Sequence, residues 1–157
     1  MEPTRKIEKV GLRNLHMEDY DQLAKSFKRI YADSDVFWTR AQIKKLITIF
    51  PEGQVVIIVD DKIVGCALSI IVNYDMVKGD HTYAQVTGNE TFNTHNPHGN
   101  ILYGIEVFIH PDYRGLRLAR RMYEYRKELC EKLNLKAIMF GGRITKYHKY
   151  TDQMRPK

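Results

Sequence analysis

The chain has 157 residues, with 25 Lys and Arg against 19 Asp and Glu, which gives a formal net charge of +6. This length suits one domain with its own core, and 43% hydrophobic residues with only 10 Gly and 5 Pro exclude a disordered chain. No apolar stretch approaches the roughly 20 residues of a membrane span. The charged first ten residues are unlike an export signal, so Cys66 and Cys130 are expected to be reduced, buried thiols of a cytoplasmic protein.

The positive charge is concentrated in the last third of the chain. Residues 111–157 hold 13 Lys and Arg against 5 Asp and Glu, whereas residues 1–110 hold 12 against 14. Such a bias favours an anionic partner: a phosphate-bearing cofactor, a nucleic acid or an acidic protein. The simpler alternative is a set of solvated helix faces.

The first fifty residues predict one strand and two helices. Residues 10–15 read as a short strand, and apolar residues at helical spacing predict an amphipathic helix over residues 17–31. Thr39 and Gln42 form a T-x-x-Q capping box. A second amphipathic helix follows this box and ends before Pro51.

The middle of the chain predicts a hairpin, a long irregular segment and another strand. The β-branched run at 54–59 and the apolar run at 63–72 flank a turn, which is typical of a β-hairpin. Residues 73–100 are polar and rich in Gly and Asn, and we expect a mobile flap that covers the substrate side of a functional site and lies outside the core. Residues 101–109 resume as a strand.

The last part predicts a long helix over residues 114–133 and a short strand over 136–140, with a further helix beginning in the tail at 145–153. The element order is then β-α-α-β-β-β-α-β, followed by that tail helix. Two hairpin strands followed by a strand–helix–strand unit predict an α/β fold in which helices cover a mixed sheet.

The segment from Ile105 to Arg121 carries the chemistry. An apolar strand runs through a tight turn into the start of the long helix, where free backbone N–H groups favour a bound phosphate. Cations oppose the helix dipole at this end, so several arginines there suggest that a bound anion compensates them. Alternatively, they point into water. The arginines are Arg114, Arg117, Arg120 and Arg121.

This segment resembles the signature of the GNAT superfamily of acyl-CoA-dependent N-acyltransferases, whose motif reads R/Q-x-x-G-x-G/A. Arg114 fills its first position and Ala119 its last, and Ile63–Gly65 matches the family's hairpin. The resemblance extends from Val10 to about Tyr150. It implies a mixed, twisted sheet with helices on both faces.

Two features depart from the family. Arg117 stands where the motif has a glycine that lets a pyrophosphate approach the backbone, so its side chain should either contact the phosphates or point away. The chain also stops at Lys157, before the family's final pair of strands. We therefore expect a single domain over residues 1–157, either a fragment of a longer chain or a variant with an open edge. The R-G-L-R-L-A sequence with Gly141–Arg143 resembles GNAT domains that precede a nitrilase-like carbon–nitrogen hydrolase domain.

The resemblance implies direct transfer of an acetyl or other acyl group from acetyl-CoA to an amine. Pantetheine would pair with the splayed strand at 105–109, and one of its N–H groups would polarise the thioester carbonyl. The implied CoA-binding residues are Val107, Phe108, Ile109, Arg114, Gly115, Leu116, Arg117, Leu118, Ala119 and Arg120.

Glu106 is the first candidate for the base that accepts the ammonium proton. Its alternative role is a strand carboxylate that pairs with a neighbouring cation. The family's acid is a Tyr on the helix after the fifth strand, which makes Tyr150 and then Tyr147 the candidates. The Asn and Ala that usually precede it are missing, so both tyrosines could instead be packing residues.

Other residues carry weaker signals. The spacing of His81, His95, His98 and His110 does not fit a metal site, and none is predicted. Cys66 is expected in the core rather than as a nucleophile. Trp38 either packs at the start of the second helix or lines the acceptor site.

Three functions compete at this stage. An acyltransferase acting on a small-molecule or peptide amine is favoured by Glu106 and the paired tyrosines. A CoA-binding regulatory module that is weak or inactive as an enzyme is favoured by Arg117 and the missing strands. A nucleic-acid binder is disfavoured, since no strand interleaves aromatic and basic residues. A homodimer and a covalently linked hydrolase domain are both open as partners.

Overall fold

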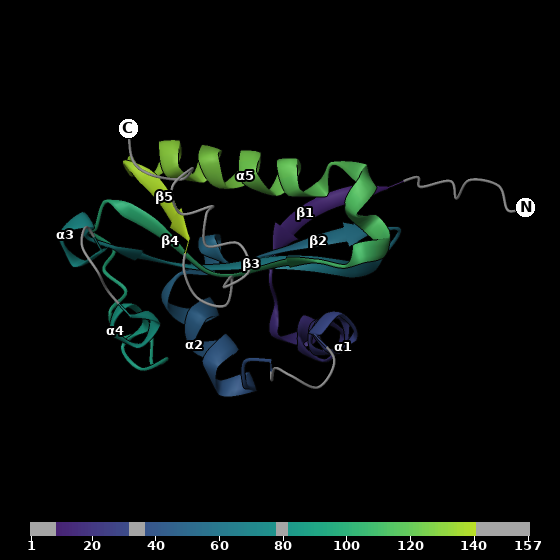
Figure 1. Cartoon of the computed structure of the whole chain (residues 1–157), viewed down its shortest axis with the longest axis horizontal. Coiled ribbons are helices and arrows are strands. Elements are labelled where there is room, and N and C mark those ends of the chain that lie inside the picture. The colour runs from purple at the N-terminus through teal and green to yellow at the C-terminus, as the bar shows by residue number, and fades with distance from the viewer. Residues whose placement is uncertain (1–8, 32–36, 78–81, 141–157) are drawn as a thin grey trace, which may run out of the picture.

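The computed structural model describes residues 9–31, 37–77 and 82–140. They form one five-stranded sheet in the order β1-β2-β3-β4-β5, in which the first four strands are antiparallel and β4 and β5 are parallel (Figure 1). The mixed sheet predicted from the sequence is confirmed. The strands are β1 (Val10–Asn14), β2 (Val55–Val59), β3 (Lys62–Val72), β4 (Ile101–Ile109) and β5 (Ala137–Phe140).

Helices cover both faces of this sheet. In Figure 1 the long helix α5 lies on one face, and α1, α2 and α4 lie on the other. Three 3₁₀ turns stand at the ends of these elements: η1 (Met17–Asp19), η2 (Pro51–Gly53) and η3 (Pro111–Leu116). The helices are α1 (Tyr20–Tyr31), α2 (Arg40–Ile49), α3 (Tyr74–Val77), α4 (Tyr83–Thr87) and α5 (Leu118–Lys132).

The core has two layers because the sheet is covered on both sides. Ten of the eleven residues of β3 are buried, as expected for a strand with helices on each face. On the α1 and α2 face, Leu23, Phe27 and Leu46 pack against Cys66 and Leu68 of β3, along with other residues. On the opposite face, Leu118 and Met122 of α5 pack against β2 and β3.

The second predicted helix begins where its capping box places it. Thr39 Oγ1 accepts a hydrogen bond from Gln42 N at 3.1 Å, and Gln42 Oε1 accepts one from Thr39 N at 2.8 Å. Two of the four free N–H groups at the helix start are satisfied in this way. The capping-box prediction is confirmed.

The expectation that residues 73–100 lie outside the core is wrong for part of the segment. Val77, Val86 and Phe92 are buried in the core on the α1 and α2 face. Backbone bonds from Asn96 N to Ile71 O and from Asn100 N to Val72 O also tie the segment to β3. These core residues are not evident in the sequence, because Val86 and Phe92 stand between polar residues and Val77 follows the exposed Met76.

The long helix starts later than predicted. Residues 111–116 form the 3₁₀ turn η3, and α5 starts only at Leu118. Arg117 lies between them in the left-handed region, with φ of +60°. A left-handed residue interrupts a right-handed helix, so residues 114–116 cannot belong to the same α-helix.

None of the helices in the described ranges is both long and apolar enough to cross a membrane.

Candidate functional site

The two halves of β4 have different neighbours. Ile101–Gly104 pair with β5 on one side and with β3 on the other. From Ile105 to Ile109, the strand continues along β3, but no strand in the described part of the chain pairs with its other edge. We call Ile105–Ile109, the stretch that β5 does not pair with, the open half of β4.

A β-bulge sets the direction of the side chains in the open half. Leu68 pairs with Glu106 and Ser69 pairs with Gly104, so Ile105 is an extra residue. The bulge reverses the alternation of the strand. Tyr103 and Ile105 therefore lie in the same core cluster as Phe108, on the face covered by α1 and α2.

A buried polar cluster holds β3 at this bulge. Gln54 Oε1 accepts a hydrogen bond from Ser69 N at 3.0 Å, and Gln54 Nε2 donates to Ser69 O at 2.8 Å. From α5, Arg126 Nη2 donates to Ser69 Oγ at 3.1 Å. We call Gln54, Ser69 and Arg126 the Ser69 clamp. Burial lowers the pKa of Arg126 to about 10.

A glycine lets β3 lie close to the open half of β4. A Cβ atom on Gly65 would lie 2.5 Å from the carbonyl oxygen of Phe108. Any other residue would push the two strands apart. Gly65, which the sequence matched to the family's hairpin, is therefore needed for the close approach of β3 to β4.

Glu106 lies in the core on the α1 and α2 side. Its side chain is only 2% exposed, and its Oε1 accepts a hydrogen bond from the indole Nε1 of Trp38 at 3.0 Å. The Trp38 ring packs against Phe92 with centroids 5.5 Å apart, and its carbonyl accepts from Tyr20 Oη at 2.6 Å. The structure thus joins three segments that are distant in sequence around one carboxylate.

The sequence did not predict the contact between Trp38 and Glu106, because the two residues are 68 positions apart and were assigned separate roles. The available signal was a single Trp directly before a capping box, since such a position is fixed by a helix start. In the same core cluster as Trp38, the Phe27 ring lies 5.1 Å from that of Phe37 and 5.6 Å from that of Phe108, two residues after Glu106.

The predicted CoA-binding residues differ in how far their side chains are exposed. Phe108 and Ile109 are buried, Leu118 is fully buried and Val107 is half-buried. These side chains serve the core, so only their backbone atoms could face a ligand. Ala119, Arg117 and Arg120 are exposed. For Arg114, Gly115 and Leu116 the structure describes the backbone in η3, and their side chains lie outside what it describes.

The turn that leads into α5 is capped by a histidine. His110 Nδ1 accepts a hydrogen bond from Asp112 N at 3.1 Å. Arg117 then turns the chain at φ of +60° and serves as the N-cap residue of α5 without a side-chain capping bond. The backbone of the strand end, turn and helix start forms one continuous path beside the open half of β4.

Tyr147 and Tyr150, the candidates for the acid, lie outside the described residues.

The remaining titratable candidates are Cys66, Cys130 and His95, and each is buried or bonded within the fold. Burial raises the pKa of the Cys66 thiol well above its usual value and that of Cys130 to about 11, so both are protonated at neutral pH. His95 Nδ1 accepts from Ile71 N at 3.0 Å, and its ring stacks on Phe50. Among the described residues, no three His, Cys, Asp or Glu side chains gather as metal ligands.

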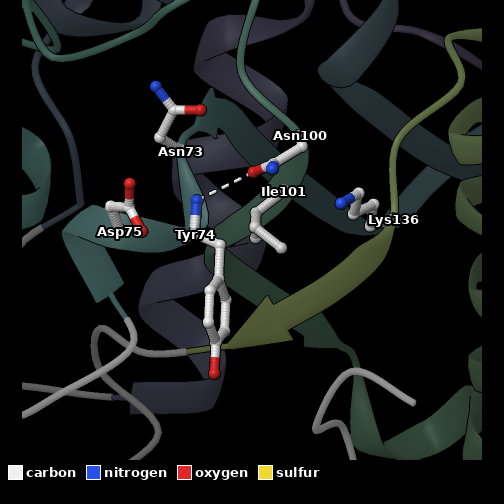
Figure 2. A pocket seen from close by; sticks show the side chains of 6 residues that line it. All are labelled: Asn73, Tyr74, Asp75, Asn100, Ile101 and Lys136. Carbon is white, nitrogen blue, oxygen red and sulfur yellow. Dashed lines mark hydrogen bonds between the residues drawn. The ribbon is translucent and has the colours of Figure 1, made fainter.

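A separate hollow of about 340 Å³ lies at the other end of β4. Figure 2 shows Lys136 and Asp75 at its two sides, and Asn100 Oδ1 accepting a hydrogen bond from Tyr74 N at 2.8 Å. Ile101, the first residue of β4, and Asn73 complete it. It contains no buried titratable group, and Glu106 and the α5 start lie toward the opposite end of β4.

The profile of the Acetyltransferase (GNAT) family matches residues 11–147 of this chain. The chain belongs to this family. Its members transfer acyl groups from acyl-CoA, and the resemblance seen in the sequence is confirmed.

Two curated relatives from Bacillus subtilis (strain 168) align with nearly all of the chain. The "Uncharacterized N-acetyltransferase YkwB" is 30% identical over 153 residues, which cover 96% of this chain and 68% of YkwB. The "Probable hydrolase YhcX" is 37% identical over 151 residues, which cover 96% of this chain. The chain spans only 29% of the length of YhcX.

Solved structures share the fold. The loading GNATL domain of CurA from Lyngbya majuscula superposes with a TM-score of 0.69 at 21% identity, covering 85% of this chain and 64% of that one. The GNAT-like decarboxylase GphF, in complex with isobutyryl-CoA, gives a TM-score of 0.65 at 15% identity, covering 89% and 71%. At these identities the likeness concerns the fold alone.

Proposed function

We propose that this chain transfers an acetyl group, or another short acyl group, from its CoA thioester directly to an amine. The observation that carries the proposal is the open half of β4, which runs into the start of α5 with a buried carboxylate beside it. Family membership supplies the acyl-CoA chemistry. The acetyl group, the amine acceptor and the residue roles are our proposal.

In this proposal, pantetheine lies along Ile105–Ile109 and pairs with the backbone groups that β5 leaves open. The pyrophosphate lies against the N–H groups of η3 and the first turn of α5, where the helix dipole favours an anion. Arg114 and Arg120 add charge there, and Arg117 contributes through its backbone. One N–H of Val107–Ile109 polarises the thioester carbonyl.

The chemical step forms a C–N bond and breaks a C–S bond. The neutral amine attacks the thioester carbonyl, and its surplus proton passes to Glu106. Because Glu106 is 2% exposed and lies behind Trp38, this proton travels through a water molecule or after the acceptor displaces the indole. The departing CoA thiolate takes a proton from Tyr150 or, as second choice, Tyr147.

The placement of CoA can be tested by hydrogen exchange combined with calorimetry. Acetyl-CoA should bind, more weakly at higher salt because its phosphates make charge-assisted contacts. Saturating CoA should slow exchange of amides in residues 105–120, and amides of β1 serve as the internal control. If CoA binds without protecting this segment, the proposed position is wrong.

The activity can be tested by CoA release from acetyl-CoA over a panel of small amines and peptide N-termini. Release that depends on an added amine, with the acetylated amine identified by mass spectrometry, supports the transferase. Tight CoA binding without turnover on any amine would favour the regulatory module instead.

We also propose that residues 1–157 act as a single acyltransferase domain that can be joined to a hydrolase domain. The support is that the matching region makes up only 29% of the "Probable hydrolase YhcX". Expression of the domain alone and in a longer natural chain, with both activities measured, tests this arrangement.

A further inference from the structure

A second surface, on the opposite side of α5 from β5, combines charges of both signs. It is a groove of about 600 Å³ between α5 and the first strand of the sheet. Three arginines lie toward the start of the helix and two glutamates follow them. The groove is lined by Leu12, Arg117, Arg120, Arg121, Glu124, Tyr125 and Glu128.

The charges of this groove are arranged against the helix dipole and are only weakly paired. Arginines at a helix start are locally unfavourable. Within the described part of the chain, these groove residues form one ion pair, between Arg120 Nε and Glu124 Oε2 at 3.9 Å. Both side chains are more than half exposed, so this pair contributes little.

The spacing of the charges makes the groove complementary to itself. Arg117, Arg121, Glu124 and Glu128 are separated by four, three and four residues, so they form one stripe along the helix. If a second α5 lies antiparallel on this stripe, Arg121 faces Glu124 of the second copy and Arg117 faces Glu128 of the second copy. Both pairs share one midpoint, between Met122 and Tyr123, so a single two-fold axis satisfies them all.

We propose that this groove is the interface of a homodimer in which two α5 helices pack antiparallel. An isologous interface requires that residue i meets j while j meets i, which the stripe fulfils. Leu12 and the half-buried Tyr125, whose Oη accepts from Asn14 Nδ2 at 3.4 Å, provide an apolar edge beside the charges. The groove shares Arg117 and Arg120 with the proposed CoA site, but its test measures dimerisation and does not depend on acyl transfer.

A second copy fits better than a nucleic acid or another polyanion. The arginines alone would suit phosphates, but Glu124 and Glu128 continue the same stripe and would repel them. Solvent-exposed ion pairs are individually weak and are screened by salt. The dimer is therefore expected to be weak and to dissociate as the salt concentration rises.

Sedimentation velocity of the 157-residue chain, at up to about 0.5 mM protein and in about 50 mM or 500 mM NaCl, tests this interface. The parent should dimerise in low salt and be largely monomeric in high salt. Arg121→Glu and Glu124→Arg should each weaken dimerisation at least about tenfold, because each replaces two attractive pairs by two repulsive ones.

A mixture of the Arg121→Glu and Glu124→Arg variants is the decisive experiment. In a mixed dimer, Glu at 121 of one chain meets Arg at 124 of the other, and Glu124 meets Arg121, so a heterodimer should form at the parent's affinity. The double variant R121E/E124R should also recover the dimer. Lys127→Glu reverses an exposed charge on the same helix away from this stripe and should leave dimerisation unchanged.

Three outcomes would overturn the proposal: a parent that stays monomeric in low salt, single reversals that dimerise as well as the parent, or a mixture in which dimerisation is not restored. Circular dichroism of each variant excludes loss of the helix as the cause of a monomeric result.

Discussion

The two halves of β4 differ in what surrounds the same strand. Ile101–Gly104 have a strand on each side and helices on both faces, as an ordinary central strand has. Ile105–Ile109 keep β3 but lose β5, and they carry the bulge, the buried Glu106 and the turn into α5. The first half is a scaffold, and the second half is where we propose that the ligand lies.

The Ser69 clamp lies at the boundary of the two halves. It fixes the β3 residue that pairs with Gly104, the last residue of β4 that β5 also contacts. Strand separation at a defined residue requires that the register cannot slip. The proposed site therefore depends on the residue at which the pairing of β4 with β5 stops.

The largest effect is expected from Glu106→Gln in the open half. The amide keeps the size of the side chain but cannot accept the proton, so turnover should fall roughly 10²–10⁴-fold with little change in CoA affinity. Steady-state kinetics of amine-dependent CoA release measure this, and the exposed Glu131→Gln is the control. Unchanged turnover between pH 6 and 9 would assign the base to water or another residue.

The next largest effect is a loss of stability expected from Arg126, which belongs to the Ser69 clamp at the boundary between the two halves of β4. Arg126→Ala leaves a cavity and takes the donor from Ser69 Oγ, so the free energy of unfolding should fall by about 2–4 kcal/mol. Arg126→Met fills the space without a buried charge and should cost less than about 1.5 kcal/mol. Urea unfolding compares the two. Equal losses in both variants would mean that the guanidinium itself, rather than its volume, stabilises the clamp.

A smaller effect is expected where Trp38 meets the open half. Trp38→Phe removes the donor to Glu106 Oε1, and a hydrogen bond stabilises the ionised carboxylate. If Glu106 is the base, the acidic limb of the rate–pH profile should move to higher pH by about one unit. Tyr20→Phe, which removes only the bond to the Trp38 carbonyl, should not move it. A lower rate with an unmoved profile would reduce Trp38 to a packing role.

The smallest effect lies at the end of the open half. Arg117→Gly relieves the left-handed conformation at the cost of extra freedom in the unfolded chain, so a net gain of about 0.5–1 kcal/mol is expected. Asn134→Gly, also at positive φ, should gain less because Asn tolerates this region. Thermal unfolding measures both.

The same Arg117→Gly variant tests how this residue meets CoA. CoA affinity should be retained, since the proposed contact is through the backbone. A loss of more than about tenfold would assign to the arginine side chain the phosphate contact that the sequence suggested.

Most of the sheet could be predicted because each strand carries its own signal. β4 matches the predicted residues 101–109, and the other strands differ at their ends by one residue. The start of α5 was predicted too early, because the spacing of apolar residues does not show that Arg117 adopts a left-handed conformation. The buried residues of the 73–100 segment were missed because Val86 and Phe92 become core residues only through partners far away in the sequence.

The sequence by itself determined the order of the five strands and of α1, α2 and α5, the mixed sheet and the family signature, but not α3 and α4. These are local properties, set by periodicity, capping and short motifs. Only the tertiary structure decided the face on which Glu106 lies, because the bulge at Ile105 reverses the alternation that its neighbours predict. It also decided that Trp38 donates to Glu106, and that Gln54 holds the Ser69 backbone while Arg126 of α5 holds its hydroxyl, since such contacts arise between segments that only packing brings together.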